Sequence, residues 1–392
     1  MCVSLFDDNL LLFSAMIDDI RAAKKSVLLE TYRFGNDAIG KRFREALLEK
    51  AQQGIEVRLL LDAYGTKANE IFFAQLIKSG VEIRFFKKIK FFFSNFFARN
   101  HTRNHRKILL IDDEIVYVGS SNLTAYSISW RDLNFRIEGT LASVFKNSFE
   151  ESFLQYRQYK LYDVMPFKKV PPVTKDGYTL YEDTPSISYQ TIRRKILQMI
   201  SIAQSEIIIE TPYFLPGYKM RKALVTAAER GVNVRIFLPL HSDIPLIDVL
   251  RNKYLGAMWK QGIKWRLYKP DNLHAKCVIV DGTRFLVGSS NLDYRSFRYQ
   301  YDLMLYGTAN SGSDVDGEDG NIGGSSSSSD NSGINSGSNN GGSSGEKILS
   351  LLKEHIDKTD EHCIEFDYEK WENTPILYKL TEWLITPFRR LF

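Results

Sequence analysis

The sequence contains few cysteines and no long apolar run, and each shortage excludes a class of protein. Its three cysteines, Cys2, Cys277 and Cys363, follow no regular spacing, which excludes a disulfide framework and the usual zinc-binding patterns. No stretch approaches the roughly 18 apolar residues of a membrane-spanning helix. The start of the chain carries Asp7 and Asp8 where a secretory signal carries positive charge. We therefore expect a protein of a reducing compartment without a transmembrane segment.

Negative charge is concentrated in one segment and scarce elsewhere. The 392 residues carry a net charge of +5, but residues 311–345 hold five acidic residues and no lysine or arginine, which leaves +10 on the remainder. Of these 35 residues, 27 are glycine, serine or asparagine. Such a composition cannot bury enough apolar surface to fold. We expect a disordered insert at 311–345 within a basic body whose partners are anionic.

An internal repeat organises the rest of the chain. Each copy has a histidine, a lysine two residues later, an aspartate that ends an apolar run, and a Gly-Ser-Ser-Asn turn. In order, the copies are His105, Lys107, Asp112 and Gly119–Asn122, and His274, Lys276, Asp281 and Gly288–Asn291. All these positions differ by 169 residues, which indicates a duplication.

The segments before each motif predict strands that alternate with helices. Val27–Leu29, Val57–Leu61, Ile207–Ile209 and Val234–Leu238 are continuous apolar runs, which are typical of strands covered on both faces. Alternation of strands and helices argues for an α/β fold with mixed, mostly parallel sheets flanked by helices.

Four segments are expected along the chain. Residues 1–165 and 166–310 form two pseudo-symmetric halves, with a proline-marked stretch at their boundary and one active site at their interface. Residues 311–345 form the insert. Residues 346–392 form a C-terminal helical segment that packs on the body or on a membrane.

The repeated motif suits chemistry on a phosphodiester. Histidine and lysine two residues apart on a strand project to the same side. A neutral imidazole is a nucleophile or base, and an ammonium group attracts a phosphate oxyanion. The two turns add hydroxyl and amide groups that support charge developing on phosphorus. These supporting residues are Ser120, Asn122, Ser289 and Asn291.

Two further aspartates complete the expected site. Asp132 follows His105 by 27 residues and Asp302 follows His274 by 28 residues, and each could accept the Nδ1–H of a histidine. One histidine would attack phosphorus and the other would serve as acid and then base, through a phosphohistidine. We expect no cofactor and no metal, because the sequence lacks an acidic cluster suited to Mg²⁺.

Asp112 and Asp281 allow two interpretations. They belong to the repeated motif and are counted with the catalytic group. Each also ends a strand, where an aspartate commonly caps the local backbone.

The motifs resemble those of the phospholipase D superfamily, and more specifically of bacterial cardiolipin synthases. The segments that carry the resemblance are Glu30–Tyr32, Asp62–Gly65, Asn104–Ile108, Trp130–Asp132, Thr211–Phe214, Leu273–Lys276 and Gly288–Phe297. The resemblance implies that His105 is the nucleophile, that His274 is the general acid and base, and that Asp132 and Asp302 orient the histidines. It also implies transfer of a phosphatidyl group between phosphatidylglycerol-like lipids, at the cytoplasmic face of a bacterial membrane.

Alternatives remain for the function and for one segment. A phospholipase D-type hydrolase of lipid, or less readily of nucleic acid, would use the same residues, and a scaffold with a decayed site is disfavoured by two intact motifs. We expect an anionic phospholipid surface, and no nucleic acid, as the partner. The Phe-rich basic segment Lys87–Arg99 is either buried in the first half or enters the lipid interface.

Overall fold

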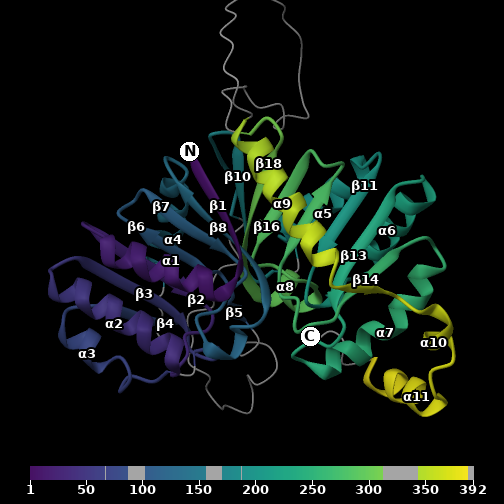
Figure 1. Ribbon diagram of the computed structural model, residues 1–392, viewed down its shortest axis with the longest axis horizontal. Coiled ribbons are helices and arrows are strands. Elements are labelled where there is room, and N and C mark those ends of the chain that lie inside the picture. The colour runs from purple at the N-terminus through teal and green to yellow at the C-terminus, as the bar shows by residue number, and fades with distance from the viewer. Residues whose placement is uncertain (67, 87–101, 156–169, 187, 312–342, 387–392) are drawn as a thin grey trace, which may run out of the picture.

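The computed structural model describes residues 1–66, 68–86, 102–155, 170–186, 188–311 and 343–386. The first half is built on a seven-stranded sheet (Figure 1). Its order is β1 (Cys2–Asp8), β8 (Arg131–Glu138), β7 (Ile115–Gly119), β6 (Ile108–Ile111), β2 (Ser26–Thr31), β3 (Glu56–Asp62) and β4 (Glu82–Phe86). The helices of this half are α1 (Asn9–Ala22), α2 (Ala38–Gln52), α3 (Ala74–Lys78) and α4 (Ala142–Gln155).

The second half repeats this plan around a larger sheet. Its order is β19 (Cys363–Glu365), β14 (Lys264–Tyr268), β13 (Asn233–Pro239), β11 (Glu206–Glu210), β15 (Cys277–Val280), β16 (Arg284–Gly288), β18 (Gln300–Thr308), β10 (Tyr178–Asp183) and β9 (Val173–Lys175). Its helices include α5 (Thr191–Ile202), α6 (Tyr218–Glu229), α7 (Pro245–Trp259), α8 (Tyr294–Tyr299) and α9 (Ser344–Asp360). The α/β class and the repeated order of helices and strands are thus confirmed.

The expectation that the strands are mostly parallel is wrong. Strands β2, β3 and β4 are parallel, as are β11, β13 and β14, but the remaining neighbours in the two strand orders given above are antiparallel. For β6 with β7 and for β15 with β16, the reason is the tight turn between the strands, at Asp112–Asp113 and Asp281–Gly282, where both residues have positive φ angles. Such turns join antiparallel hairpins, and the Asp-Gly pair is a standard signal for them.

Apolar clusters cover both faces of the sheets. One cluster lies under α1 and α2 in the first half, and a second lies under α5, α6 and α7 in the second half. The third cluster joins the two halves, since it contains Ile108 and Phe145 from the first half together with Ile279 and Leu352 from the second half and α9. The two repeats therefore share one continuous core.

Helix α9 occupies in the second half the place that α4 occupies in the first. Helix α4 follows β8, and α9 is the next described helix after β18 and lies across β18 and β14 while also contacting β1 (Figure 1). The expected C-terminal segment thus completes the second repeat. It also contributes β19 to the sheet edge, followed by α10 (Tyr368–Glu372) and α11 (Ile376–Ile385).

The chain leaves β18 and enters α9 at almost the same point. The backbone N–H of Gly345 donates to the carbonyl oxygen of Ser311 at 2.8 Å, and the Ser343 hydroxyl donates to the carbonyl oxygen of Ala309. Most of the expected insert, together with Lys87–Arg99 and the boundary at residues 165 and 166, lies outside the described residues.

Candidate active site

Each motif strand begins by pairing with the other half of the molecule. The short strand β5 (Arg103–Asn104) runs parallel to the start of β18, and the backbone N–H of His105 donates to the Tyr301 carbonyl at 2.9 Å. In the mirrored position, the backbone N–H of His274 donates to the Arg131 carbonyl of β8 at 2.7 Å. The segment that carries each histidine, just before β6 or β15, is therefore fixed by the strand that carries the opposite aspartate.

The two histidines are oriented by carboxylates from opposite halves. Nδ1 of His105 lies 3.0 Å from Oδ1 of Asp302, and Nδ1 of His274 lies 2.7 Å from Oδ1 of Asp132. All four side chains are buried. A carboxylate at this distance accepts the Nδ1–H, which leaves the lone pair on Nε2 for attack on phosphorus or for proton transfer. The structure brings these four predicted residues together as two crossed pairs.

The serines of the two turns hold these carboxylates in place. The Ser120 hydroxyl donates to Oδ1 of Asp132 at 2.6 Å, and the Ser289 hydroxyl donates to Oδ1 of Asp302 at 2.7 Å. Gly119 precedes the first serine, and a Cβ atom there would lie 2.3 Å from the Leu133 carbonyl oxygen. The glycine therefore permits the close approach that places the serine under its aspartate.

Both motif lysines are buried beside the histidines. Each Nζ donates to the carbonyl oxygen of its own histidine at 2.6 Å, Lys107 to His105 and Lys276 to His274. Burial, followed by the charge of Lys276, lowers the pKa of Lys107 to about 7, and burial lowers the pKa of Lys276 to about 8. Because the two lysines repel each other in a buried site, they favour the binding of an anion between them.

The same environment lowers the pKa of both imidazoles. Burial, with the charges of Lys107 and Lys276, lowers the pKa of His105 well below its ordinary value. Burial and the charge of Lys276 also lower the pKa of His274. A neutral imidazole is the form that can act as a nucleophile or accept a proton.

The two aspartates differ although their contacts to histidine are alike. Burial alone would raise the pKa of Asp132, but His274, Lys276 and the accepted hydrogen bonds lower it below the ordinary range. Burial raises the pKa of Asp302 to about 6. The crossed pairs are therefore electrostatically unequal.

The asparagines of the turns have capacity left for a ligand. Asn122 and Asn291 are buried, and within the described residues neither Oδ1 atom has a hydrogen-bond partner. A buried polar atom without a partner normally signals a missing group. An oxygen acceptor suits a hydroxyl group of a substrate better than its phosphate, and the predicted supporting role of both asparagines stays a prediction.

Asp112 and Asp281 do not join the catalytic group. Each Oδ1 atom accepts three backbone N–H groups, from Lys24, Lys25 and Ser26 for Asp112 and from Gln204, Ser205 and Glu206 for Asp281. Strand β6 separates Asp112 from Lys107 by about 16 Å of extended chain. Their place is at the far end of the motif strands, where the capping interpretation applies.

Two aromatic residues at the site were not assigned a role from the sequence. The Tyr32 ring meets the His105 ring edge-on with centroids 5.2 Å apart, and the Trp130 ring lies 5.1 Å from His274. Tyr126, which is 60% exposed, contacts Trp130 in turn. Both aromatic residues lie in segments that carry the family resemblance, Tyr32 after Glu30–Thr31 and Trp130 just before Asp132. That position is the sequence feature that points to a role at the site.

Two arginines add positive charge around the site. Arg33 follows Tyr32, and Arg295 follows the second turn; in the described part of the chain their buried Nε atoms have no hydrogen-bond partner. Arg295 contributes to lowering the pKa of His105, and Arg33 to lowering that of Lys107.

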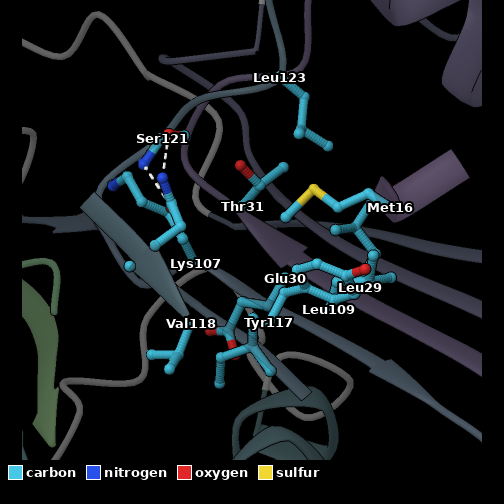
Figure 2. Close-up of a pocket in the computed structure, with 13 residues that line it drawn as sticks. Met16, Leu29, Glu30, Thr31, Lys107, Leu109, Tyr117, Val118, Ser121 and Leu123 are labelled. Carbon is cyan, nitrogen blue, oxygen red and sulfur yellow. Dashed lines mark hydrogen bonds between the residues drawn. The ribbon is translucent and has the colours of Figure 1, made fainter. Parts of the chain in front are cut away.

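A small pocket lies on the α1 side of the Lys107 side chain. Figure 2 shows Lys107 and Ser121 at one end of this pocket and Met16 projecting from α1. In its wall, Nδ2 of Asn134 donates to the Ser121 hydroxyl at 2.6 Å. The site thus continues into a polar chain beneath α1.

Comparison with known proteins places this site in a family. A family model described as a cardiolipin synthase, PLD-like domain matches residues 16–154 and 196–310. The chain belongs to this family. It is 32% identical over 325 residues to a cardiolipin synthase of Clostridium perfringens, with 78% of this chain and 66% of the relative covered. It is 30% identical over 304 residues to the major cardiolipin synthase of Bacillus subtilis, with 75% and 63% covered.

Solved structures show the same fold. A phosphatidylserine synthase from Haemophilus influenzae aligns over 100% of this chain and 95% of its own, with a TM-score of 0.71 at 13% identity. A polyphosphate kinase from Porphyromonas gingivalis aligns over 78% of this chain and 44% of its own, with a TM-score of 0.51 at 12% identity. Among the described residues, no helix has the length and apolar character needed to cross a membrane.

Proposed function

We propose that the protein is a phosphatidyltransferase that makes cardiolipin from phosphatidylglycerol or a related phospholipid donor. The observation that carries this proposal is the pair of crossed His–Asp contacts, which forms one active centre from both halves. The names of the cardiolipin synthases that the chain resembles supply the substrate class.

The chemistry starts from neutral His105, with a lone pair on Nε2, and from His274 carrying a proton on Nε2. Nε2 of His105 attacks phosphorus, the phosphorus–oxygen bond to glycerol breaks, and His274 donates its proton to the leaving oxygen. A second phosphatidylglycerol then enters. His274 takes the proton of its hydroxyl group as that oxygen attacks phosphorus, and the phosphorus–nitrogen bond to His105 breaks. Cardiolipin leaves and both histidines return to their starting state.

Positive charge supports both transfers. Lys107, Lys276, Arg33 and Arg295 surround the histidines and offset the charge that builds on the phosphoryl oxygens. The histidines and lysines of this centre are buried, which strengthens these interactions relative to water.

We further propose peripheral binding to the cytoplasmic face of a bacterial membrane. The basic composition of the chain outside residues 311–345 supports an anionic surface. Leu10 and Leu11 are 51% and 65% exposed at the start of α1, next to Asn9, which contacts Asp132. Exposed apolar side chains at the site suit entry of a lipid substrate.

The deciding experiment is product analysis with vesicles of phosphatidylglycerol. Formation of cardiolipin with release of one glycerol per cardiolipin supports the proposal. Accumulation of phosphatidic acid instead would assign the protein to the phospholipase D-type hydrolases. Absence of both products would overturn the proposed donor.

A further inference from the structure

The two crossed pairs differ in what lies behind the carboxylate. Nδ2 of Asn9 donates a hydrogen bond at 3.0 Å to Oδ2 of Asp132, the oxygen that His274 leaves free. Within the described residues, the equivalent Oδ2 of Asp302 has no hydrogen-bond partner. The duplication therefore preserved the contact to histidine but not the contact behind it.

The Asn9 amide is fixed in one orientation. Its Nδ2 also donates to the Ser127 carbonyl at 2.7 Å, and its Oδ1 accepts the Ser121 hydroxyl at 2.6 Å. The Ser121 hydroxyl is held in turn by Nδ2 of Asn134. An amide whose oxygen already accepts a hydroxyl must present its nitrogen to Asp132. With an exposed fraction of 1%, Asn9 is shielded from water.

A local irregularity in β1 creates this difference. The pairing of β1 with β8 shifts register between Phe6 and Asp8, and Asp7 points instead to Arg131 and His355. A bulge commonly redirects a side chain in this way. The displaced strand end lets the first residue of α1, Asn9, reach the site.

The second half has no such irregularity at the corresponding place. Strand β10 places Asp183 directly opposite Asp302 on β18, and directly opposed residues share one face of the sheet. Oδ2 of Asp183, like that of Asp302, has no hydrogen-bond partner in the described part of the protein. The Asn9 amide therefore lies behind the His274–Asp132 pair, and the Asp183 carboxyl group lies behind the His105–Asp302 pair.

We propose that Asn9 is a positioning residue that reserves the general acid–base role for His274, by donating a hydrogen bond to the outer oxygen of Asp132. This rests on the proposed function. The hydrogen bond from Asn9 holds the Asp132 carboxylate in place beside His274, and an anionic Asp132 stabilises His274 while that histidine carries the proton for the leaving group.

The opposite arrangement favours His105 as the nucleophile. Two buried carboxyl groups that face each other cannot both ionise easily. Burial raises the pKa of Asp183 to about 7 and that of Asp302 to about 6. A proton on either carboxyl group weakens the attraction of Asp302 for a charged His105, which favours the neutral form of His105.

Other charged groups surround the two crossed His–Asp pairs, and both motif lysines influence both pairs. The groups facing His274 and Asp132 are Lys276, Asp243 and, through the lysine cluster and the second dyad, Lys107 and His105. The groups facing His105 and Asp302 are Lys107, Lys276, His274, Arg106, Arg295, Asp183 and Asp293. The Asn9 amide is the uncharged donor that distinguishes the first set.

The test is the pH dependence of kcat/KM for glycerol release from phosphatidylglycerol vesicles. Glycerol leaves in the first step whether the acceptor is lipid or water. This step needs neutral His105 and protonated His274, so the acidic limb reports the former and the basic limb the latter. In Asn9→Leu, Asp132 loses the contact that holds it beside His274, so the basic limb should move to lower pH by about 1 unit while the acidic limb stays in place.

A mirrored variant tests the idea independently of how well Asn9→Leu folds. Asp183→Asn places an amide behind Asp302 and keeps the Oδ1 that accepts the Thr191 N–H at 2.6 Å. The acidic limb should move to higher pH, while the basic limb stays.

The outcomes separate this inference from the proposed function. An Asn9→Leu enzyme with both limbs at the wild-type positions, or an Asp183→Asn enzyme with an unmoved acidic limb, would overturn the role of Asn9. Phosphatidic acid in place of cardiolipin from the wild-type enzyme would overturn the transferase assignment alone, because glycerol release still reports both limbs.

Discussion

Nδ1 of His274 lies 2.7 Å from Oδ1 of Asp132, a residue of the other half and 142 positions earlier in the chain. The converse contact joins His105 to Asp302 at 3.0 Å. Neither half contains both a catalytic histidine and the aspartate that orients it. The active centre therefore depends on the packing of the halves against each other through their shared core.

Replacing either orienting aspartate should disable the site without unfolding it. In Asp132→Asn and Asp302→Asn the amide can donate to Nδ1, which favours the histidine tautomer with hydrogen on Nε2. We expect kcat/KM to fall by about 100-fold or more in each variant. Steady-state kinetics on phosphatidylglycerol vesicles would measure this. The matched control is Asp281→Asn, which should retain wild-type kcat/KM; an equal loss there would show that the effect is general.

The two histidines should be separable with a donor whose leaving group needs no proton. His105→Ala and His274→Ala should each abolish cardiolipin formation. With a nitrophenyl ester of phosphatidic acid, His274→Ala should still release one equivalent of nitrophenol in a burst, because His105 can attack, whereas His105→Ala should release none. A burst from His105→Ala alone would reverse the assignment of the nucleophile.

Asp281 should matter for stability and not for catalysis. Its carboxylate accepts three backbone N–H groups, and its φ angle of 54° suits aspartate or asparagine. Asp281→Ala should lower the free energy of unfolding by about 2 kcal/mol while the folded enzyme keeps its kcat. Urea denaturation would measure the loss. Asp281→Asn, which keeps an acceptor and the backbone preference, should lose less; a catalytic defect with unchanged stability contradicts the capping role.

His355 should make the stability of the fold depend on pH. Burial alone would lower its pKa, but Glu210 and Asp7, at 2.8 and 3.1 Å, raise it. A raised pKa means that this contribution is fully present below about pH 6.5 and is lost as pH rises through the folded-state value. Wild type should therefore lose more stability than His355→Gln between pH 6 and pH 9 in urea denaturation. His362→Gln, at an exposed histidine, serves as control and should follow the wild type.

The catalytic groups were predictable from the sequence because the duplication marks them twice. Histidine, lysine and the turn serines recur at one offset, and Asp132 and Asp302 recur within one residue of it. The crossing of the pairs was not predictable, since sequence spacing cannot tell whether a strand packs on its own repeat or on the other. Asn9 has no repeat counterpart, so no comparison of the two copies could have found it.

The strand directions illustrate a different limit. Apolar runs before each motif correctly indicated buried strands, but periodicity does not distinguish parallel from antiparallel neighbours. The Asp281–Gly282 pair is itself a hairpin signal and predicts an antiparallel neighbour for β15. The role of α9 was hidden because the segment between β18 and α9 separates it in sequence from the repeat it completes.

The hydrogen bond between Gly345 and Ser311 holds the end of β18 and the start of α9 together. When two ends are already held together, doubling the intervening length changes the closure entropy by only about 0.6 kcal/mol. This junction is therefore a suitable insertion site for protein engineering. A fluorescent domain or a protease site could be inserted there while the two crossed His–Asp pairs remain intact.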